Sequence, residues 1–211
     1  MTQKEIIIAH ASKMFIAQGV KAVRMDDIAQ ELSISKRTLY ELFVDKEELL
    51  YQSLLHFLVE GQLRRKEYSK SVENSLEVML VCLRDMISYA PMTSRLRTNL
   101  KRFYPTVYER LNNDTYANSM ADLHRWIKEC IASGYFTSTA DSELVVKVLH
   151  DSVQGILLTD RYGSTDSVHV VSMITYAIVI FIRGLCTISG MEVIDRCFDK
   201  YFGNITSIDS L

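Results

Sequence analysis

The chain has only two prolines in 211 residues, Pro91 and Pro105, and this scarcity limits the folds that it can adopt. Proline interrupts helices and the interiors of sheets, and it is common in the tight turns that join strands. Glycine, the other frequent turn residue, occurs only eight times. Apolar residues recur at intervals of three and four along most of the chain, which is the spacing of one helix face. The sequence therefore predicts an all-α protein built from long helices.

Start and stop signals divide the chain into a series of helices. Gly19 ends the first helix, whose apolar face is Ile7, Ala11, Met14 and Phe15. Asp45 is a good N-cap for a later helix, and Glu48 stands three residues on, as in a capping box. The polar segment 64–71 (RRKEYSKS) is a candidate boundary. Further helices are expected near 25–32, 35–43, 45–66, 72–86, 105–134, 141–160, 167–189 and 192–202.

Two short helices with a three-residue break between them follow the first helix. The break is Ser33 to Ser35, and the helix after it buries Leu39 and Phe43. Two such helices, with a third packed across them, form a helix-turn-helix unit, whose second helix enters the major groove of DNA by its N-terminal end. The sequence predicts a three-helix domain of this kind in residues 1–50 and a larger helical domain in residues 51–211, bridged by the helix from residue 46.

Cations stand at the start of the second short helix, where Ser35 is placed to cap it and Lys36, Arg37 and Thr38 follow. A helix dipole favours anions at this end, so cations there need another reason. Lysine and arginine donate to guanine O6 and N7, and threonine bonds to bases or touches the thymine methyl group. We therefore expect this first turn to read an operator in double-stranded DNA, which supplies the missing negative charge.

The overall charge of the chain does not by itself indicate a nucleic-acid partner. The chain has 24 basic and 26 acidic residues and a net charge of −2, and its first 50 residues hold seven lysines and arginines against eight acidic residues. The prediction therefore depends on where the charges lie. The alternative is that these cations form only a solvated face, as most surface charges do.

Residues 5–60 resemble the DNA-binding domain of the TetR family of transcriptional regulators. The resemblance rests on Met14-Phe15 with Gly19, on MDDIAQELSISKRTLYELF at 25–43, and on DKEELL at 45–50. It implies that Ser35, Lys36 and Thr38 begin the recognition helix. The rest of the chain resembles the family only in the lengths and order of its helices.

The same resemblance implies contacts with the phosphate backbone, from Tyr40 and from Lys46 at the start of the next helix. Arg37 stands where the family often has glycine, so it adds a base or phosphate contact of its own. The threonine or serine that usually caps the preceding helix is replaced by Arg24, which is expected to reach a phosphate instead. The missing cap would cost roughly 1 kcal/mol, offset by Asp26 and Asp27.

Dimerisation is expected because one helix-turn-helix covers one half-site. Residues 170–182 (VVSMITYAIVIFI) are apolar on every side, and this run is too short for a membrane span. We expect this helix and the one before it to form a four-helix interface across a two-fold axis, the arrangement that the resemblance also implies. The candidate interface residues are Val148, Gly155, Ile174, Ile178 and Phe181.

A small-molecule pocket in the larger domain is implied by the resemblance, with binding that changes the spacing of the two recognition helices. The effector is expected to be apolar or amphipathic because no cluster of charges stands out in these helices. The candidate pocket residues are Met79, Met86, Tyr89, Tyr104, Tyr116, Met120, His124 and Gln154.

An enzyme is not indicated, because no P-loop, G-x-S-x-G, H-E-x-x-H or paired-cysteine motif occurs. We predict no catalytic residue, no metal and no cofactor. The four scattered cysteines and the lack of a secretory signal favour a cytoplasmic protein with reduced thiols. The leading hypothesis is a dimeric repressor released from DNA by its effector. The alternatives are an activator of the same family and a protein-interaction adaptor that reuses the helix-turn-helix shape.

Overall fold

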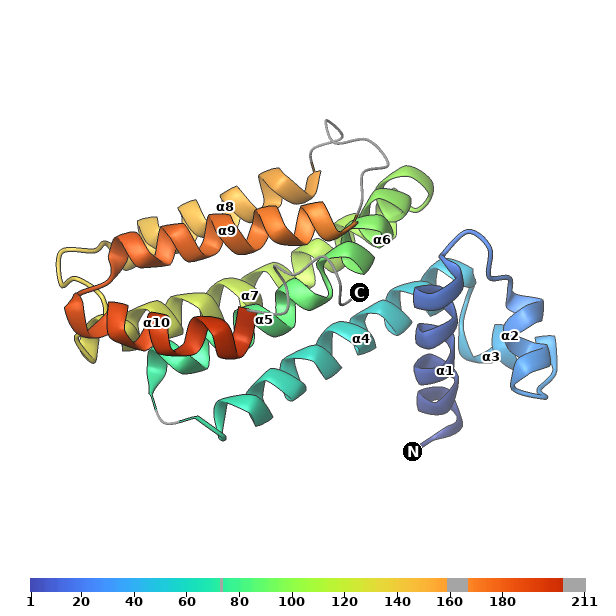
Figure 1. Ribbon diagram of the computed structural model, residues 1–211. Helices are drawn as coiled ribbons and strands as arrows, with labels where there is room; N and C mark the ends of the chain where they lie inside the picture. The colour runs from blue at the N-terminus through green and yellow to red at the C-terminus, as the bar shows by residue number, and fades with distance from the viewer. Residues whose placement is uncertain (73, 159–166, 203–211) are drawn as a thin grey trace. The chain divides into compact units, whose positions relative to one another are not determined.

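The computed structural model describes residues 1–72, 74–158 and 167–202, and within them the chain is helical with no β-strand (Figure 1). The expected all-α fold is confirmed. The helices are α1 Gln3–Gln18, α2 Met25–Glu31, α3 Lys36–Leu42, α4 Lys46–Ser69, α5 Ser75–Ser88, α6 Ala90–Phe103, α7 Pro105–Ala132, α8 Ser142–Leu158, α9 Ser167–Leu185 and α10 Ile188–Phe202.

Helix α6 is the element for which the sequence patterns predicted no helix. Pro91 marks the end of α5, but it also stands in the first turn of α6, where its missing N–H group costs nothing and its fixed φ suits a helix. The apolar face of α6 is narrow, with Leu96 half-buried and Leu100 buried, and cations surround it. A helix with so few buried residues has a weak periodic signal.

The chain divides into two compact units. The first contains residues 1–64 and 95–116, and the second contains residues 65–94 and 117–211, apart from those not described. Helices α4, α6 and α7 have residues in both units. The first unit therefore holds the predicted helix-turn-helix domain together with parts of three further helices.

The core of the first unit fixes the positions of the three N-terminal helices. Phe15 of α1, Ile28 of α2 and Leu39 of α3 are completely buried, and Leu49 and Leu50 of α4 join them. Side chains that have no exposed surface hold their helices in one arrangement, because interiors are packed as densely as organic crystals. The outer face of α3 is thereby presented from a rigid base.

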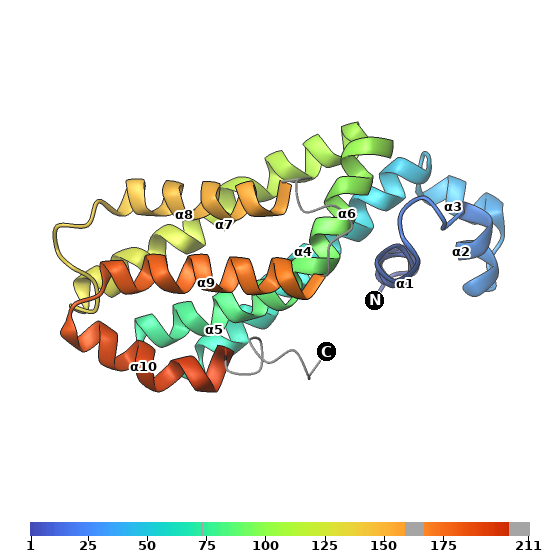
Figure 2. The ribbon, with the colours of Figure 1, turned by 45° about the horizontal axis from the view of Figure 1, so that its top comes forward.

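The second unit is a helical bundle with its own core, drawn from α5 and from α7 to α10. Helices α8 and α9 lie side by side in both views (Figures 1 and 2). Ile174, Ile178 and Ile182 of α9 are buried in this core. Tyr176 and Ile180 of the same helix are exposed, so α9 keeps an apolar outer face in the isolated chain.

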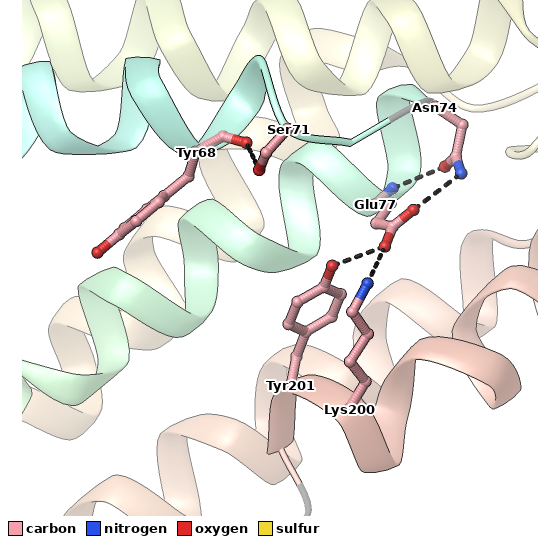
Figure 3. A network of polar contacts seen from close by, with 6 residues as sticks. All are labelled: Tyr68, Ser71, Asn74, Glu77, Lys200 and Tyr201. Atoms are coloured by element: carbon pink, nitrogen blue, oxygen red, sulfur yellow. Dashed lines mark hydrogen bonds and ion pairs between the residues drawn. The ribbon is translucent and has the colours of Figure 1, made fainter.

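A polar network joins α10 to the start of α5 within the second unit (Figure 3). The side chain of Asn74 caps α5 by accepting from the backbone N–H of Glu77 at 2.8 Å. The Glu77 carboxylate accepts from Tyr201 Oη at 2.6 Å and pairs with Lys200 Nζ at 2.9 Å. The hydrogen bond from Tyr201 lowers the pKa of Glu77, so the carboxylate stays charged at neutral pH.

The four cysteines are free thiols, and three of them are buried. Burial raises the pKa of Cys82 to about 11 and that of Cys130 to about 12, so both thiols stay protonated at neutral pH. In the part of the chain that the structure describes, no helix combines the length and the hydropathy that crossing a membrane requires.

Candidate nucleic-acid interface

The start of α3 is built as a capped helix terminus with polar side chains outside and apolar ones behind. Ser35 Oγ accepts from the backbone N–H of Thr38 at 3.0 Å and lies 2.8 Å from Thr38 Oγ1. Leu39 and Phe43, which follow on the inner side, are buried. Ser35 and Thr38 are therefore engaged in holding the terminus, and Lys36 beside them is exposed.

Both cations of this first turn already have an acidic partner. Lys36 Nζ lies 2.8 Å from Asp26 Oδ1 of α2, and this hydrogen bond raises the pKa of Lys36. Arg37 Nε lies 2.7 Å from Glu41 Oε1, one turn further along α3. Exposed ion pairs of this kind contribute less than about 1 kcal/mol, so phosphates or bases can replace the carboxylates. The pairing also explains how a nearly neutral domain can present cations at one edge.

The start of α2 has lost its usual cap but keeps a substitute. Arg24 occupies the N-cap position, and its backbone N–H donates to Asp27 Oδ2 at 2.8 Å. This contact is one half of a capping box, with the carboxylate supplied three residues into the helix. The Arg24 side chain is not needed for the cap and is exposed.

The turn between α2 and α3 contains a residue in a strained conformation. Ser33 has φ 53°, which is the left-handed region. A side chain there costs roughly 1 kcal/mol, which glycine would avoid. A hydrogen bond from the backbone N–H of Ile34 to Ala29 O, at 3.0 Å, holds the turn to the end of α2.

The two residues expected to touch phosphates differ in their surroundings. Tyr40 lies on α3 with nearly half of its surface exposed. Lys46 is half-buried, and its Nζ donates to Val20 O in the α1–α2 turn at 2.8 Å. The same ammonium group lies 5.3 Å from the Tyr104 ring centre and 5.9 Å from that of Phe15. In this structure Lys46 fastens the start of α4 to the α1–α2 turn.

Beside the α3–α4 turn, charged residues of α4 and α7 surround a hollow of about 490 Å³. The side chain of Asp45 caps α4, as expected, by accepting from the backbone N–H of Glu48 at 2.8 Å. The Glu48 carboxylate pairs with Arg110 Nη1 of α7 at 2.6 Å. Tyr51 Oη donates to Asp114 at 2.5 Å, and this bond raises the pKa of Tyr51.

No pattern in the sequence indicates the roles of Arg110 and Asp114. They stand one turn apart on α7, but their partners lie 62 and 63 residues earlier in the chain. No local pattern connects residues so far apart. The two contacts hold the first turns of α7 against α4 within the first unit.

The candidate pocket residues do not lie together in one described cavity. Tyr104 and Tyr116 belong to the first unit, and the other candidates belong to the second. Met79 is buried in the core, while Met86 is exposed. The side chain of Tyr116 lies outside the described residues. Tyr89 and Met120 are half-buried.

Two polar pocket candidates of the second unit, His124 and Gln154, each contact another polar side chain. His124 Nε2 lies 3.0 Å from Ser142 Oγ. Gln154 Nε2 lies 3.3 Å from His150 Nε2, and within the described residues its buried Oε1 has no hydrogen-bond partner. Among those residues there is also no cluster of three or more histidine, cysteine or acidic side chains that could hold a metal ion.

The candidate interface residues separate into buried and exposed groups. Ile174 and Ile178 lie in the core of the second unit, and Phe181 is half-buried. Val148 and Gly155 are exposed on α8. The sequence could not distinguish the inner from the outer side of a helix that is apolar all round.

A comparison with protein-family models gives one match in this region. Residues 7–52 match the model described as bacterial regulatory proteins, tetR family. The match begins in α1 and ends in the first turns of α4, so it spans α2 and α3 with the turn between them. The resemblance seen in the sequence is thereby confirmed. A search of curated proteins found no match.

Solved structures share the fold over most of the chain. A transcriptional regulator from Cytophaga hutchinsonii superposes with a TM-score of 0.77 at 16% identity, covering 87% of this chain and 98% of its own. A TetR-family regulator from Pectobacterium atrosepticum gives 0.68 at 22%, covering 87% and 94%. The Bacillus subtilis regulator FadR, solved with stearoyl-CoA, gives 0.65 at 15%, covering 87% and 100%. All three are described as transcriptional regulators.

Proposed function

We propose that this chain, whose residues 7–52 form a DNA-binding domain of the tetR family of bacterial regulatory proteins, is a dimeric transcriptional repressor that a small molecule releases from DNA. The observation that carries the proposal is the start of α3. Its exposed Lys36 and Arg37 stand on a capped terminus, backed by the buried Leu39 and Phe43. Such a terminus has the reach and the rigidity that reading base edges in a major groove requires.

The remaining phosphate contacts are proposed around this terminus. Arg24 at the start of α2 and Tyr40 on the outer side of α3 are both exposed. Lys46 is proposed to act from the start of α4, where the positive end of the helix dipole adds to its charge. Ser35 and Thr38 contribute to base or phosphate contacts as well as to the cap.

The dimer interface is proposed on the outer face of α8 and α9. Leu144 and Val148 of α8 and Tyr176 and Ile180 of α9 are apolar and exposed in the isolated chain. A face of this kind is covered at low cost by the same face of a second copy across a two-fold axis. The adjacent Gly155 on α8 has open space around it, which allows a close approach.

The effector is proposed to be apolar or amphipathic and to bind within residues 51–211. The shared fold supports a small-molecule effector, because FadR of Bacillus subtilis was solved with stearoyl-CoA and a regulator from Saccharomonospora viridis with choline. Of these two ligands, the amphipathic stearoyl-CoA is of the class proposed here. Binding that favours a different spacing of the two recognition helices would lower DNA affinity, and the coupling is reciprocal.

The test is a binding titration of the purified protein on its own upstream intergenic DNA, beside a scrambled duplex, at two salt concentrations. We expect tight and selective binding whose affinity falls steeply with salt. Equal affinity for both duplexes would place the operator elsewhere. Failure to bind either duplex at low salt would refute the regulator and favour the protein-interaction adaptor.

A further inference from the structure

A run of 23 residues, from Met86 to Tyr108, contains four cations and no acidic residue, in a chain whose net charge is −2. The four cations are Arg95, Arg97, Lys101 and Arg102, and all lie on the part of α6 that belongs to the first unit. The proposed contacts of α2, α3 and α4 do not use them. The same unit carries the proposed DNA-binding surface, so this charge asymmetry needs its own explanation.

Three of these four cations lie on the outer side of α6. Leu96 and Leu100 pack against the core, whereas Arg95, Lys101 and Arg102 are exposed. Within the described residues none of these three forms an ion pair. This is unlike Lys36 and Arg37, whose charges are matched by carboxylates at 2.8 and 2.7 Å.

A cation from another element joins them at the end of α6. Lys21, in the turn between α1 and α2, places its Nζ 4.7 Å from the centre of the Phe103 ring. The guanidinium of Arg102 lies 5.2 Å from the same centre. We call Lys21 and Arg102, with the Phe103 ring between them, and the exposed Lys101 that precedes Arg102 on α6, the basic corner. The ring holds two cations near each other without neutralising either.

The basic corner is continuous with the proposed DNA-binding surface. Lys21 is three residues before Arg24, which stands at the start of α2. The residue after Phe103, Tyr104, lies beside Lys46 at the start of α4, and Lys46 is bonded to the turn that carries Lys21. The starts of α2 and α4 are the proposed phosphate contacts, so the corner lies at their edge within one compact unit.

We propose that the basic corner binds the phosphate backbone of the DNA that flanks the half-site read by α3. This inference rests on the proposed function and extends it. Uncompensated lysine and arginine side chains at the edge of a DNA-binding surface match the charge of a phosphate backbone and carry no base specificity. The cations at the end of α6 also suit the negative end of its dipole, which keeps this turn helical when no DNA is bound.

The test removes two charges of the corner and compares the result with a matched loss of charge elsewhere. The variant is Lys101→Gln with Arg102→Gln, since glutamine keeps the helix propensity and the polar length. The control is Lys128→Gln with Arg84→Gln, which removes one lysine and one arginine, both exposed, from the second unit. Unfolding curves for both double variants check that they fold as the wild type does.

The probe is a random-sequence duplex of about 40 base pairs, roughly four helical turns, because phosphate contacts need no operator. Each lost contact should lower the slope of log affinity against log salt by about 0.9. For two contacts in one protomer, the ratio of wild-type to variant affinity should therefore change about 12-fold between 50 and 200 mM salt. Lys21→Gln, on a different element, should lower the slope by about 0.9 by itself.

The possible outcomes distinguish a failure of the basic corner from a failure of the proposed DNA-binding function. A reduced slope for the corner variants, with the wild-type slope for the control, would support the basic corner. The wild-type slope in all variants, or an equal reduction in variant and control, would overturn it while leaving the DNA-binding function intact. Loss of binding to anionic lipid vesicles with unchanged DNA binding would assign the corner to a membrane surface and also overturn it. A wild-type protein that binds no duplex would refute both proposals.

Discussion

Replacing Asp26 by asparagine should strengthen DNA binding, although it removes an ion pair from the protein. In the structure the Asp26 carboxylate lies 2.8 Å from Lys36 Nζ, and both side chains are more than half exposed, at 62% and 56%. The carboxylate therefore competes with DNA for the cation that we expect to approach it. Asparagine keeps the size of the side chain and removes the charge.

The expected gain follows from two contributions of the same sign. Lys36 no longer has to leave an ion pair when it binds DNA, and this contribution is small because solvent screens exposed pairs. If a phosphate approaches to roughly 7 Å from Asp26, removing the negative charge relieves a repulsion of about 0.6 kcal/mol at the dielectric constant of water and about twice that at half this value. Together they amount to about 1 kcal/mol per protomer, which corresponds to about a fivefold higher affinity.

The assay is fluorescence anisotropy with labelled duplex at two salt concentrations, on both random-sequence DNA and the upstream fragment. Asp122→Asn is the matched control, because it breaks an exposed 2.8 Å ion pair with Arg125 in the second unit. Asp26 also stabilises the first turn of α2, so its loss should cost less than about 1 kcal/mol of folding free energy. Thermal unfolding of both variants measures this cost separately.

An unchanged or weaker affinity of Asp26→Asn, with a protein that remains folded, would refute the reasoning. It would mean that Lys36 does not face DNA and that the pair serves only to join α2 and α3. A similar gain in the Asp122→Asn control would instead attribute the effect to net charge.

Four further predictions concern single positions. Arg37→Ala should weaken binding to the upstream fragment more than binding to random DNA, by about 1–3 kcal/mol if it contacts a base, whereas equal losses in the two titrations would make Arg37 a phosphate contact. Ile180→Glu should give folded monomers in sedimentation, because Ile180 is exposed. Ile178→Glu should instead unfold the protomer, because Ile178 is buried. A stable Ile180→Glu dimer would exclude the α8–α9 face as the dimer interface. Ser33→Gly should raise the free energy of unfolding by about 0.5–1 kcal/mol in urea titrations by relieving the left-handed conformation, and a loss of stability would contradict this. Glu77→Gln should lower the melting temperature at pH 7, because the depressed pKa of Glu77 stabilises the fold while the carboxylate is charged. The difference from wild type should disappear as the pH falls below the lowered folded-state pKa of Glu77. A difference independent of pH would mean that the charge of Glu77 does not matter.

Local signals account for the parts of the fold that were predicted from sequence. The caps at Ser35 and Asp45 each depend on a bond to a backbone N–H three residues away, so a short window of sequence contains both partners. Gly19 ends α1 with φ 91°, a conformation that glycine adopts without strain. The end of the break between α2 and α3 is also predicted locally, because Ser35 caps α3.

Helix α6 shows where local signals fail. Its two core-facing leucines give too little periodicity to indicate a helix, and its proline is a signal both for the end of one helix and for the start of the next. Helix α6 is held by packing against a core to which α1, α2, α3, α4 and α7 also contribute. Tertiary packing therefore determines it more than propensity does.

The sequence by itself determined that this protein is helical, that its first residues form a helix-turn-helix, and which side chains begin α3. These properties depend on helix periodicity and on contacts three or four residues apart, which any short segment carries within itself. Only the tertiary structure decided that Lys36 is paired with Asp26, that Lys46 fastens α4 to the α1–α2 turn, and which face of α9 is buried. Each of these depends on how separate elements pack together. Periodicity along one helix contains no information about the neighbours of that helix.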